Sequence, residues 1–385
     1  MAFIHLDEAK QAAVLQVRHC LDKFTSIERA LLATDLFGKL RVILWAPSEA
    51  FKKLRAPLGR NFKRACGPWW TGEMLNARDA NKGDDNLWEH GWNSAHSVPG
   101  NDRFRILERH RNRTGWFQEY AKPLWKAPEG GPPILFFYSF KGGVGRSTAL
   151  ASFVIQRARK GDRVVVVDFD LDAPGVGQLL AADEKGTSSP WGTVDYLLER
   201  TQGKVPLPDY HHPCSRVAGK GEILVFSAGH LDAGYVDKLA RVDFVQTSTG
   251  DRSLIAQLLE DIRSVKPNWI LLDARTGLSE PSGHLLSGLA HLHVLFGTTS
   301  EQSWQGLRVV IDRLGKQRVL DNKAQSECLL VQAMVPADIE VARRATETFA
   351  ERARSEFTEH YYAEEPAAPS DESLWDVRDL DSEDA

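Results

Sequence analysis

Runs of apolar residues alternate with amphipathic stretches through the second half of this chain. Short, nearly continuous apolar runs are typical of strands that are buried on both faces. We expect strands near 134–139, 163–168, 223–228, 269–273, 291–296 and 328–334, with helices between them, such as 253–264 and 303–314. This alternation predicts an α/β fold with a doubly wound, mostly parallel sheet that binds ligands at the carboxyl ends of its strands.

The first 130 residues follow a different pattern. Apolar residues recur at helical spacing over 6–21 and over 26–37, a short strand is expected at 41–45, and the Gly-, Asn- and Asp-rich stretch 79–100 is expected to be a loop. This predicts a smaller N-terminal domain at 1–130 that is α+β or mostly helical. Prolines and glycines over 123–133 indicate a linker to a second domain at 131–362.

Charge separates the same two regions. Residues 1–130 contain 21 Lys and Arg against 15 Asp and Glu, whereas the rest of the chain contains 27 against 37. Residues 363–385 form an acidic tail that we expect to be flexible. The uneven charge predicts two modules of different function.

The composition of the chain indicates the cellular compartment in which we expect the protein. The chain has no run of 18 apolar residues, and Asp7 and Glu8 interrupt any signal peptide, so we expect a cytoplasmic protein without a membrane partner. The four cysteines are scattered without a C-x-x-C pair. That pattern predicts reduced thiols and gives no support to a zinc site.

The residues from Phe140 to Thr148, F-K-G-G-V-G-R-S-T, carry the clearest chemistry. They follow a predicted strand and precede a helix expected at 149–159. Three glycines permit a tight turn whose N–H groups converge on an anion, and the N-terminus of the helix adds positive charge. The stretch therefore predicts a polyphosphate cradle.

The cradle departs from the generic P-loop, because Phe140 replaces the first Gly and Arg146 replaces the Lys. With Lys141 opening the loop, it resembles the deviant Walker A motif of the ParA/MinD group of ATPases, and within it a subset with K-G-G-V-G-R. Two later segments agree with this resemblance. Asp168-Phe169-Asp170 follows one predicted strand, and Asp273 ends another in the manner of a Walker B carboxylate.

The resemblance implies ATP and Mg²⁺ as cofactors. The nucleotide would be bound by the loop and, at adenine, by a glutamine on the last strand: Gly142, Gly143, Val144, Gly145, Arg146, Ser147, Thr148 and Gln332. The metal would be held by Ser147, Asp168 and Asp273. The catalytic residues would be Lys141, Asp170 and Arg146.

The resemblance also implies an ATP-dependent homodimer, in which Lys141 reaches the partner's nucleotide. Because a guanidinium is wider and more planar than an ammonium, Arg146 predicts ATP hydrolysis with low turnover. We read Arg275 either as a γ-phosphate contact or as an ion-pair partner of Asp168 or Asp170, and His291 and His293 as structural.

A basic stripe precedes two tryptophans in the N-terminal region: Lys52, Lys53, Arg55, Arg60, Lys63 and Arg64, then Trp69 and Trp70. Cations beside aromatic rings suit nucleic acid. The same residues also suit a solvated helix face with core tryptophans. A second basic cluster, at 103–113, would share a helix face.

These observations leave three functions open. The first is a ParA/MinD-like ATPase that acts as a nucleotide-dependent dimerisation switch, in a bacterial conflict or antiphage defence system by analogy with the K-G-G-V-G-R subset. The second is a non-hydrolysing ATP-binding adaptor that recruits a protein effector such as a nuclease. The third is a DNA-binding ATPase of the partition type.

Overall fold

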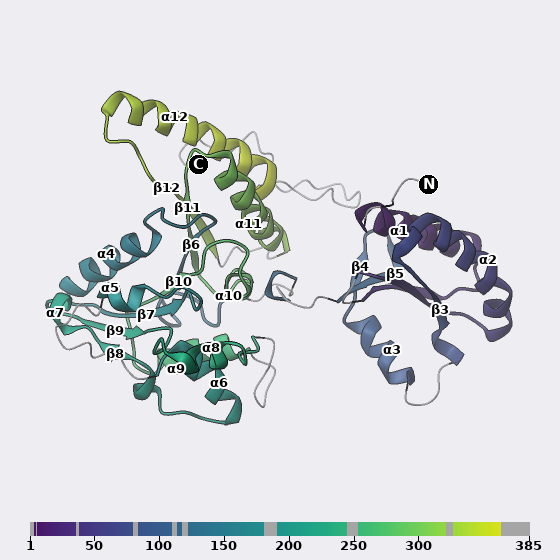
Figure 1. Cartoon of the computed structure of the whole chain (residues 1–385), viewed down its shortest axis with the longest axis horizontal. Coiled ribbons are helices and arrows are strands. Elements are labelled where there is room, and N and C mark those ends of the chain that lie inside the picture. The colour runs from purple at the N-terminus through teal and green to yellow at the C-terminus, as the bar shows by residue number, and fades with distance from the viewer. Residues whose placement is uncertain are drawn as a thin grey trace. The chain divides into compact units, whose positions relative to one another are not determined.

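The computed structural model describes residues 4, 6–35, 38–79, 84–109, 114–117, 122–180, 191–244, 253–320 and 326–362. The chain divides into two compact units, residues 1–112 and 113–385. Each unit has its own sheet (Figure 1). The predicted acidic tail at 363–385 lies outside the described residues.

The first unit is a five-stranded mixed sheet in the order β3-β2-β1-β5-β4. Helices α1 and α2 cover one face and α3 lies on the other (Figure 1). Because alternate residues of a strand point to opposite faces, Leu32 of β1 packs under α1 and α2, while Leu31 packs on the side of α3. The bounds are α1 Leu6–Lys23, β1 Arg29–Thr34, β2 Leu40–Trp45, α2 Ser48–Cys66, β3 Trp70–Asn76, α3 Asp84–Asn93, β4 His96–Val98 and β5 Asn101–Glu108.

Two predictions for elements of this unit are wrong. The stretch 26–37 contains strand β1 in place of a helix, because both of its faces are buried and its apolar residues are consecutive. The expected loop at 79–100 contains α3 and β4, since Trp88 and Trp92, four residues apart, give α3 a face that packs on the sheet. The mostly helical alternative is therefore excluded.

The second basic cluster is also not a helix face. Arg103 and Arg105 lie on strand β5. The Arg103 guanidinium donates to the carbonyls of Leu21 and Ile27, and Arg105 donates to the carbonyl of Trp92. Both side chains therefore tie the sheet to its surroundings, and residues 111 and 113 lie outside the described part of the chain.

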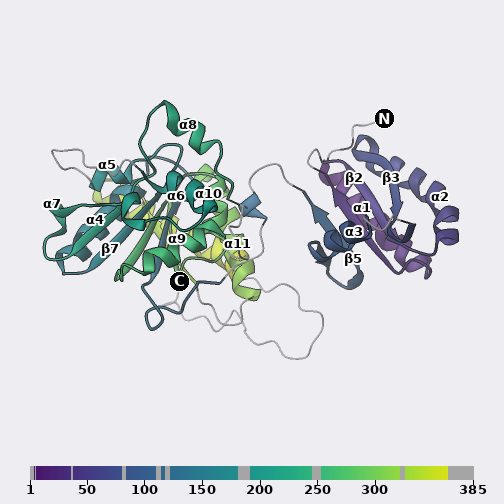
Figure 2. The same ribbon diagram turned by 90° about the horizontal axis from the view of Figure 1, so that it is seen from below.

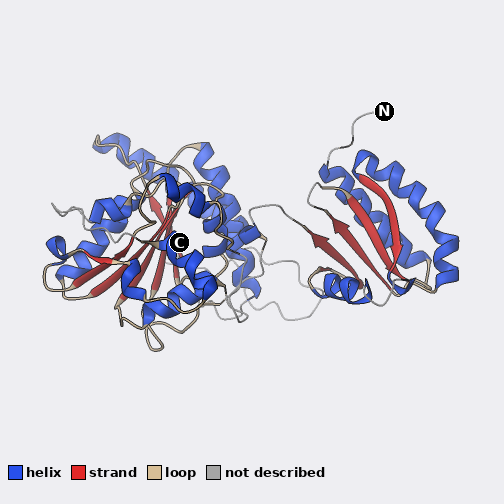
Figure 3. Cartoon of the chain, turned by 60° about the horizontal axis from the view of Figure 1, so that its bottom comes forward, coloured by secondary structure: helices blue, strands red, loops and turns tan. Residues whose placement is uncertain are grey.

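The second unit is a seven-stranded sheet in the order β12-β11-β6-β10-β7-β9-β8, parallel except for β8. Figures 2 and 3 show helices on both of its faces. In β6, Phe136 and Tyr138 pack on one face and Phe137 on the other. The predicted α/β fold with a doubly wound, mostly parallel sheet is confirmed.

The strands of this unit are β6 Ile134–Ser139, β7 Arg163–Phe169, β8 His212–Pro213, β9 Glu222–Phe226, β10 Trp269–Ala274, β11 Leu292–Gly297 and β12 Glu327–Gln332. Its helices are α4 Arg146–Arg159, α5 Val176–Leu180, α6 Thr193–Glu199, α7 Ser215–Ala218, α8 Ala233–Leu239, α9 Leu254–Arg263, α10 Glu280–Leu285, α11 Glu301–Leu320 and α12 Ile339–Glu356.

The predicted linker at 123–133 belongs to this second unit. The Trp125 indole is buried in its core and donates to the carbonyl of Pro132 over 2.7 Å. The His291 ring nitrogen Nε2 lies 2.7 Å from the carbonyl oxygen of Trp125. The second unit begins before the boundary expected at residue 130. The reason is that the buried Trp125 side chain anchors the Pro- and Gly-rich stretch to the core of this unit.

Candidate functional site

The glycine loop lies between the end of β6 and the start of α4, as the motif predicts. Gly143 and Gly145 have φ angles of +74° and +85°, which glycine adopts without strain. A Cβ added at Gly142, Gly143 or Gly145 would meet no atom within 4 Å. The loop is therefore open on the side where its glycines lie, which leaves room for an anion against the backbone.

Phe140 stands where the generic motif has glycine, and the structure gives a packing reason. Its ring lies against Gly306 of α11, where an added Cβ would come within 2.0 Å of the ring carbon Cγ. Phe140 is half-buried against the core of the second unit. The first loop position is thus used to anchor the loop to α11, and Gly306 is a residue that sequence reasoning missed.

Two carboxylates lie side by side at the carboxyl ends of neighbouring strands. Asp273 of β10 pairs in register with Asp168 of β7, and both are at most 1% exposed. The oxygens of Asp168 accept the N–H groups of Asp170 and Gly175 over 3.0 and 3.2 Å. Burial, and then the nearby Asp273, raise the pKa of Asp168 to about 7. Burial also raises the pKa of Asp273, against the opposing effect of Arg146.

Arg146 is the centre of this cluster. Its Nε donates to Asp273 Oδ1 over 2.8 Å, and its Nη2 donates to Asp170 Oδ2 over 3.3 Å. Ser147 Oγ accepts from Arg146 Nη2 over 3.2 Å and donates to Asp273 Oδ2 over 2.7 Å. The guanidinium is 7% exposed. Its positive charge therefore neutralises Asp273, which was predicted to hold the metal, and Asp170, which was predicted to take part in hydrolysis.

Three polar atoms of this cluster have no hydrogen-bond partner among the described residues, although they are buried: Ser139 Oγ, Arg146 Nη1 and Asp170 Oδ1. An unpaired buried polar atom costs free energy unless a ligand or water satisfies it. Together with the open glycine loop, the two donors, Ser139 Oγ and Arg146 Nη1, fit a bound polyphosphate. Asp170 Oδ1 is an acceptor, which fits a water molecule or a cation. The Ser147 hydroxyl beside Asp273 fits the oxygen ligands that Mg²⁺ prefers.

A metal site is nevertheless not assembled by the described side chains, which contain no group of three or more His, Cys, Asp or Glu placed to hold an ion. Asp168 is directed to backbone amides, and Asp273 is engaged by Arg146 and Ser147. Of the predicted metal ligands, the structure brings Ser147 and Asp273 into contact and leaves Asp168 beside them.

Within the described structure, the other predicted residues make no side-chain hydrogen bond or ion pair to this cluster, and they lie in the loop, at the start of α4 and at the end of β12. Lys141 is half-buried and makes no ion pair with another described residue, Val144 packs on the core face of α4, and Thr148 is exposed. Gln332 ends β12, and its Nε2 is buried without a hydrogen-bond partner in the described structure.

One expectation for Arg275 is wrong. Arg275 forms an ion pair with Asp172, and not with Asp168 or Asp170, because Arg146 and backbone amides already engage those two carboxylates. Tyr138, which sequence reasoning did not single out, donates from its hydroxyl to the carbonyl of Gly277 over 3.1 Å. This bond ties the segment after β10 to the strand that precedes the glycine loop.

His291, directly before β11, and His293 of β11 lie in structural environments, as do the buried cysteines Cys20 and Cys66. His291 Nδ1 accepts the N–H of Ile134 over 3.0 Å, and burial lowers the pKa of His293 to about 4. Burial raises the pKa of Cys20 and Cys66 to about 11, which keeps these thiols protonated. No helix in the described part of the chain is both long and apolar enough to cross a membrane.

Comparison with known proteins gives relatives that match part of this chain. An iron-sulfur cluster carrier protein of Saccharolobus solfataricus is 33% identical over 139 residues, which are 32% of this chain and 44% of that protein. Cytosolic Fe-S cluster assembly factor cfd1 of Aspergillus clavatus is 25% identical over 153 residues, 40% of this chain and 44% of that protein. The chain thus spans less than half the length of the curated relatives it matches.

Among solved structures, a putative plasmid partition protein of Borrelia burgdorferi B31 bound to AMPPNP is 16% identical, with a TM-score of 0.43. The match covers 57% of this chain and 83% of that one. The model of the CobQ/CobB/MinD/ParA nucleotide binding domain matches residues 135–348. That range holds the glycine loop, both strand-end carboxylates and Arg146, and the chain belongs to the CobQ/CobB/MinD/ParA nucleotide-binding family.

Proposed function

We propose that this protein is an ATP-binding, slowly hydrolysing ParA/MinD-like ATPase that acts as a nucleotide-dependent dimerisation switch. Membership in a nucleotide-binding family and the open glycine loop support the ATP site. The observation that carries the slow turnover is the position of Arg146. Its Nε and Nη2 are bonded to Asp273 and Asp170, which leaves Nη1 without a partner among the described residues.

In this proposal Arg146 offers Nη1 to a phosphate oxygen while its other two nitrogens stay on the carboxylates. A guanidinium donates through several nitrogens in a fixed fork, so one arginine can bind the two carboxylates and a phosphate oxygen at the same time. Asp170 is the residue that would position the attacking water, and its Oδ2 already accepts from Arg146 Nη2. In this proposal hydrolysis is slow because Arg146 engages one of the two carboxylate oxygens of Asp170 and holds the side chain in place.

Ser147 and Asp273 would hold magnesium, which would supply positive charge next to the phosphates when bound. The backbone N–H groups of the loop and the N-terminus of α4 would orient the β-phosphate. The unpartnered amide Nε2 of Gln332, at the carboxyl end of β12, is a donor suited to a ring nitrogen or carbonyl of the base.

Lys141 is the residue that would connect nucleotide to dimerisation. It lies at the start of the loop, is half-buried, and makes no ion pair with a described residue of its own chain. A lysine without an internal counter-charge can neutralise phosphate charge on a second subunit. The switch therefore predicts a dimer that forms with ATP and not with ADP.

Light scattering with ATP, with ADP and without nucleotide tests the switch, with phosphate release recorded in parallel. Lys141→Ala should abolish the ATP-dependent dimer. Lys160→Ala should not, because Lys160 is an exposed lysine at the far end of α4 and makes no ion pair with a described residue. A mass that ignores nucleotide, or equal behaviour of the two variants, would overturn the switch.

The position of Arg146 also favours a second function, a non-hydrolysing ATP-binding adaptor that recruits a protein effector. ATP-dependent dimerisation without phosphate release over hours would support the adaptor and contradict the slow ATPase. The role in conflict or defence systems that the K-G-G-V-G-R subset implies stays a prediction.

A further inference from the structure

The outer face of α1 and α2, in the first unit, has no part in the nucleotide site. Helix α2 carries six basic residues, all exposed, and its one acidic residue is Glu49. Lys52 pairs with Glu49, whereas the remaining five make no ion pair with another described residue: Lys53, Arg55, Arg60, Lys63 and Arg64. These cations are available to an external anion.

Three of the unpaired cations form a line along the helix. Lys53, Arg60 and Arg64 are spaced by seven and four residues, which places them on one stripe of an α-helix. Their Cα atoms span about 16 Å at the usual rise of about 1.5 Å per residue. Phosphates of one strand of a duplex recur about every 3.4 Å along its axis, so a stripe of this length can face several phosphates of one strand.

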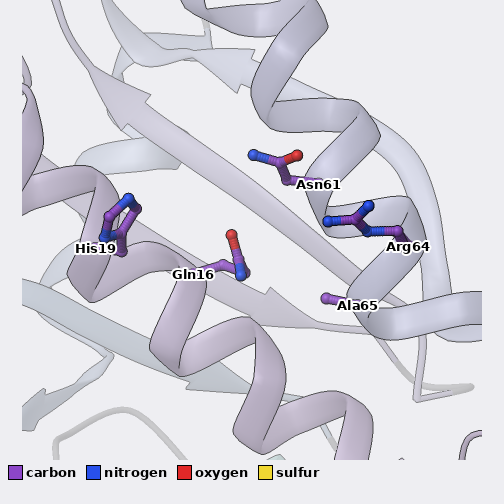
Figure 4. A pocket seen from close by; sticks show the side chains of 5 residues that line it. All are labelled: Gln16, His19, Asn61, Arg64 and Ala65. Carbon is purple, nitrogen blue, oxygen red and sulfur yellow. The ribbon is translucent and has the colours of Figure 1, made fainter.

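A groove lies beside this stripe, between α1 and α2 (Figure 4). Its volume is about 420 Å³, and its lining residues are Gln16, His19, Asn61, Arg64 and Ala65. Figure 4 shows two of these side chains on one helix facing the others across the groove. The lining offers two amides, an imidazole and a guanidinium, and it contains no carboxylate, so it suits a phosphate oxygen.

The neighbouring tryptophans decide how a nucleic acid could be held. Trp70 is 8% exposed and stacks on Phe62 with ring centroids 4.9 Å apart. The Trp69 indole donates to the carbonyl of Ile4 over 2.9 Å and packs on the core. Neither ring is free to stack on an unpaired base, which removes the usual means of holding a single strand.

We infer that the α1/α2 face, with its groove, is a contact surface for the phosphate backbone of double-stranded nucleic acid. Phosphate contacts fix position and carry no sequence information, so binding is independent of sequence. The first unit as a whole is basic, with 18 Lys and Arg against 13 Asp and Glu in residues 1–112. This favours approach of a polyanion from any direction.

Fluorescence anisotropy of a labelled duplex DNA of about 20 base pairs, titrated with the full-length protein, tests the inference. A protein that contacts about four phosphates should lose affinity with a slope of about −3.6 in log K against log salt. Lys53→Gln/Arg60→Gln/Arg64→Gln should weaken binding about 10- to 100-fold at low salt and make the slope shallower by about 2.7. Asn61→Glu, which places a carboxylate in the groove, should also weaken binding.

The matched control is Lys160→Gln/Lys204→Gln/Lys220→Gln, which removes the same charge from exposed lysines of the second unit that make no ion pair with described residues. Its affinity and slope should equal those of the wild type, with ATP or without. An equal loss in the control, affinity that does not fall with salt, binding to single strands alone, or no binding at low salt would each overturn the inference. None of these outcomes bears on the nucleotide switch.

Discussion

The basic residues of α2 and Arg146, at the end of the glycine loop, occupy opposite environments. Arg146 is 7% exposed and bonded to two carboxylates and a hydroxyl. The cations of α2 are exposed, and five of the six have no acidic partner among the described residues. A buried ion contributes to stability and to site geometry through its partners, whereas an exposed, unpaired ion contributes charge to the surface.

A basic residue therefore has different consequences in the two units, according to whether it is buried or exposed. Removing a partner of Arg146 should alter folding and nucleotide chemistry together. Removing the charge of α2 should alter only what binds to the outside. Four sets of substitutions test this contrast.

Asp273→Asn should have the largest effect. It leaves the Arg146 guanidinium buried with a single remaining carboxylate at 3.3 Å, and breaking a buried pair in this way costs about 3–5 kcal/mol. Urea denaturation followed by tryptophan fluorescence measures the change in the free energy of unfolding. Asp237→Asn is the control, because Asp237 pairs with Arg241 at the surface and its loss should leave the curve unchanged. An unaltered curve for Asp273→Asn would mean that Arg146 is not held by this carboxylate.

Glu356→Gln tests a case between the buried Arg146 and the exposed cations of α2. Here a buried carboxylate pairs with two partly exposed arginines, Arg308 and Arg352. Glu356 is 3% exposed and accepts from Arg308 over 2.8 and 2.6 Å and from Arg352 over 2.8 Å. Its loss should cost about 2 kcal/mol at pH 7, less than a fully buried pair, because solvent screens the arginines.

The effect of Glu356→Gln should depend on pH. The hydrogen bond to Arg308 holds the pKa of Glu356 below its ordinary value of 4.5. A carboxyl group with a lowered pKa contributes stability that is complete above its unfolded pKa and is lost as the pH falls through the folded pKa. The wild type and the variant should therefore converge below pH 4.5, and a difference that is constant between pH 3 and 7 would contradict this account.

Arg146→Lys should change the chemistry more than the fold. An ammonium on a flexible stem cannot reproduce the forked contact with Asp273 and Asp170, so Asp170 should be freed to position water. We expect phosphate release to rise about tenfold, which corresponds to about 1.4 kcal/mol in the activation barrier. Single-turnover phosphate release measures it, and Arg159→Lys, at the exposed end of α4, is the control. A slower Arg146→Lys enzyme would show that the guanidinium promotes the reaction.

The triple substitution of Lys53, Arg60 and Arg64 by glutamine should have the smallest effect on stability. These side chains are exposed and make no ion pair with described residues, and substitutions of that kind usually stay within about 0.5 kcal/mol. The thermal midpoint should match that of the wild type. A large decrease would show that α2 depends on these cations for folding, which would remove the contrast between the two regions.

Local sequence patterns were enough to predict the parallel sheet of the second unit and the position of its glycine loop between a strand and a helix. Buried parallel strands read as continuous apolar runs, and the glycine loop, Asp168, Asp170 and Asp273 all follow such runs, so their convergence at one edge of the sheet could be expected. The amphipathic helix α2 and its exposed charge were equally accessible, because they depend on local spacing.

Other features depend on contacts between segments that are far apart in the sequence. The stretch 29–34 became a strand because two layers of helices bury both of its faces, and Trp88 and Trp92 made a helix from a polar segment by packing on the sheet. Likewise, only three-dimensional contact could show that Trp70 stacks on Phe62 and that Arg275 meets Asp172. Arg146 pairs with residues 24 and 127 positions away, and side-chain partners at such separations depend on how the strands are ordered, which no local pattern encodes.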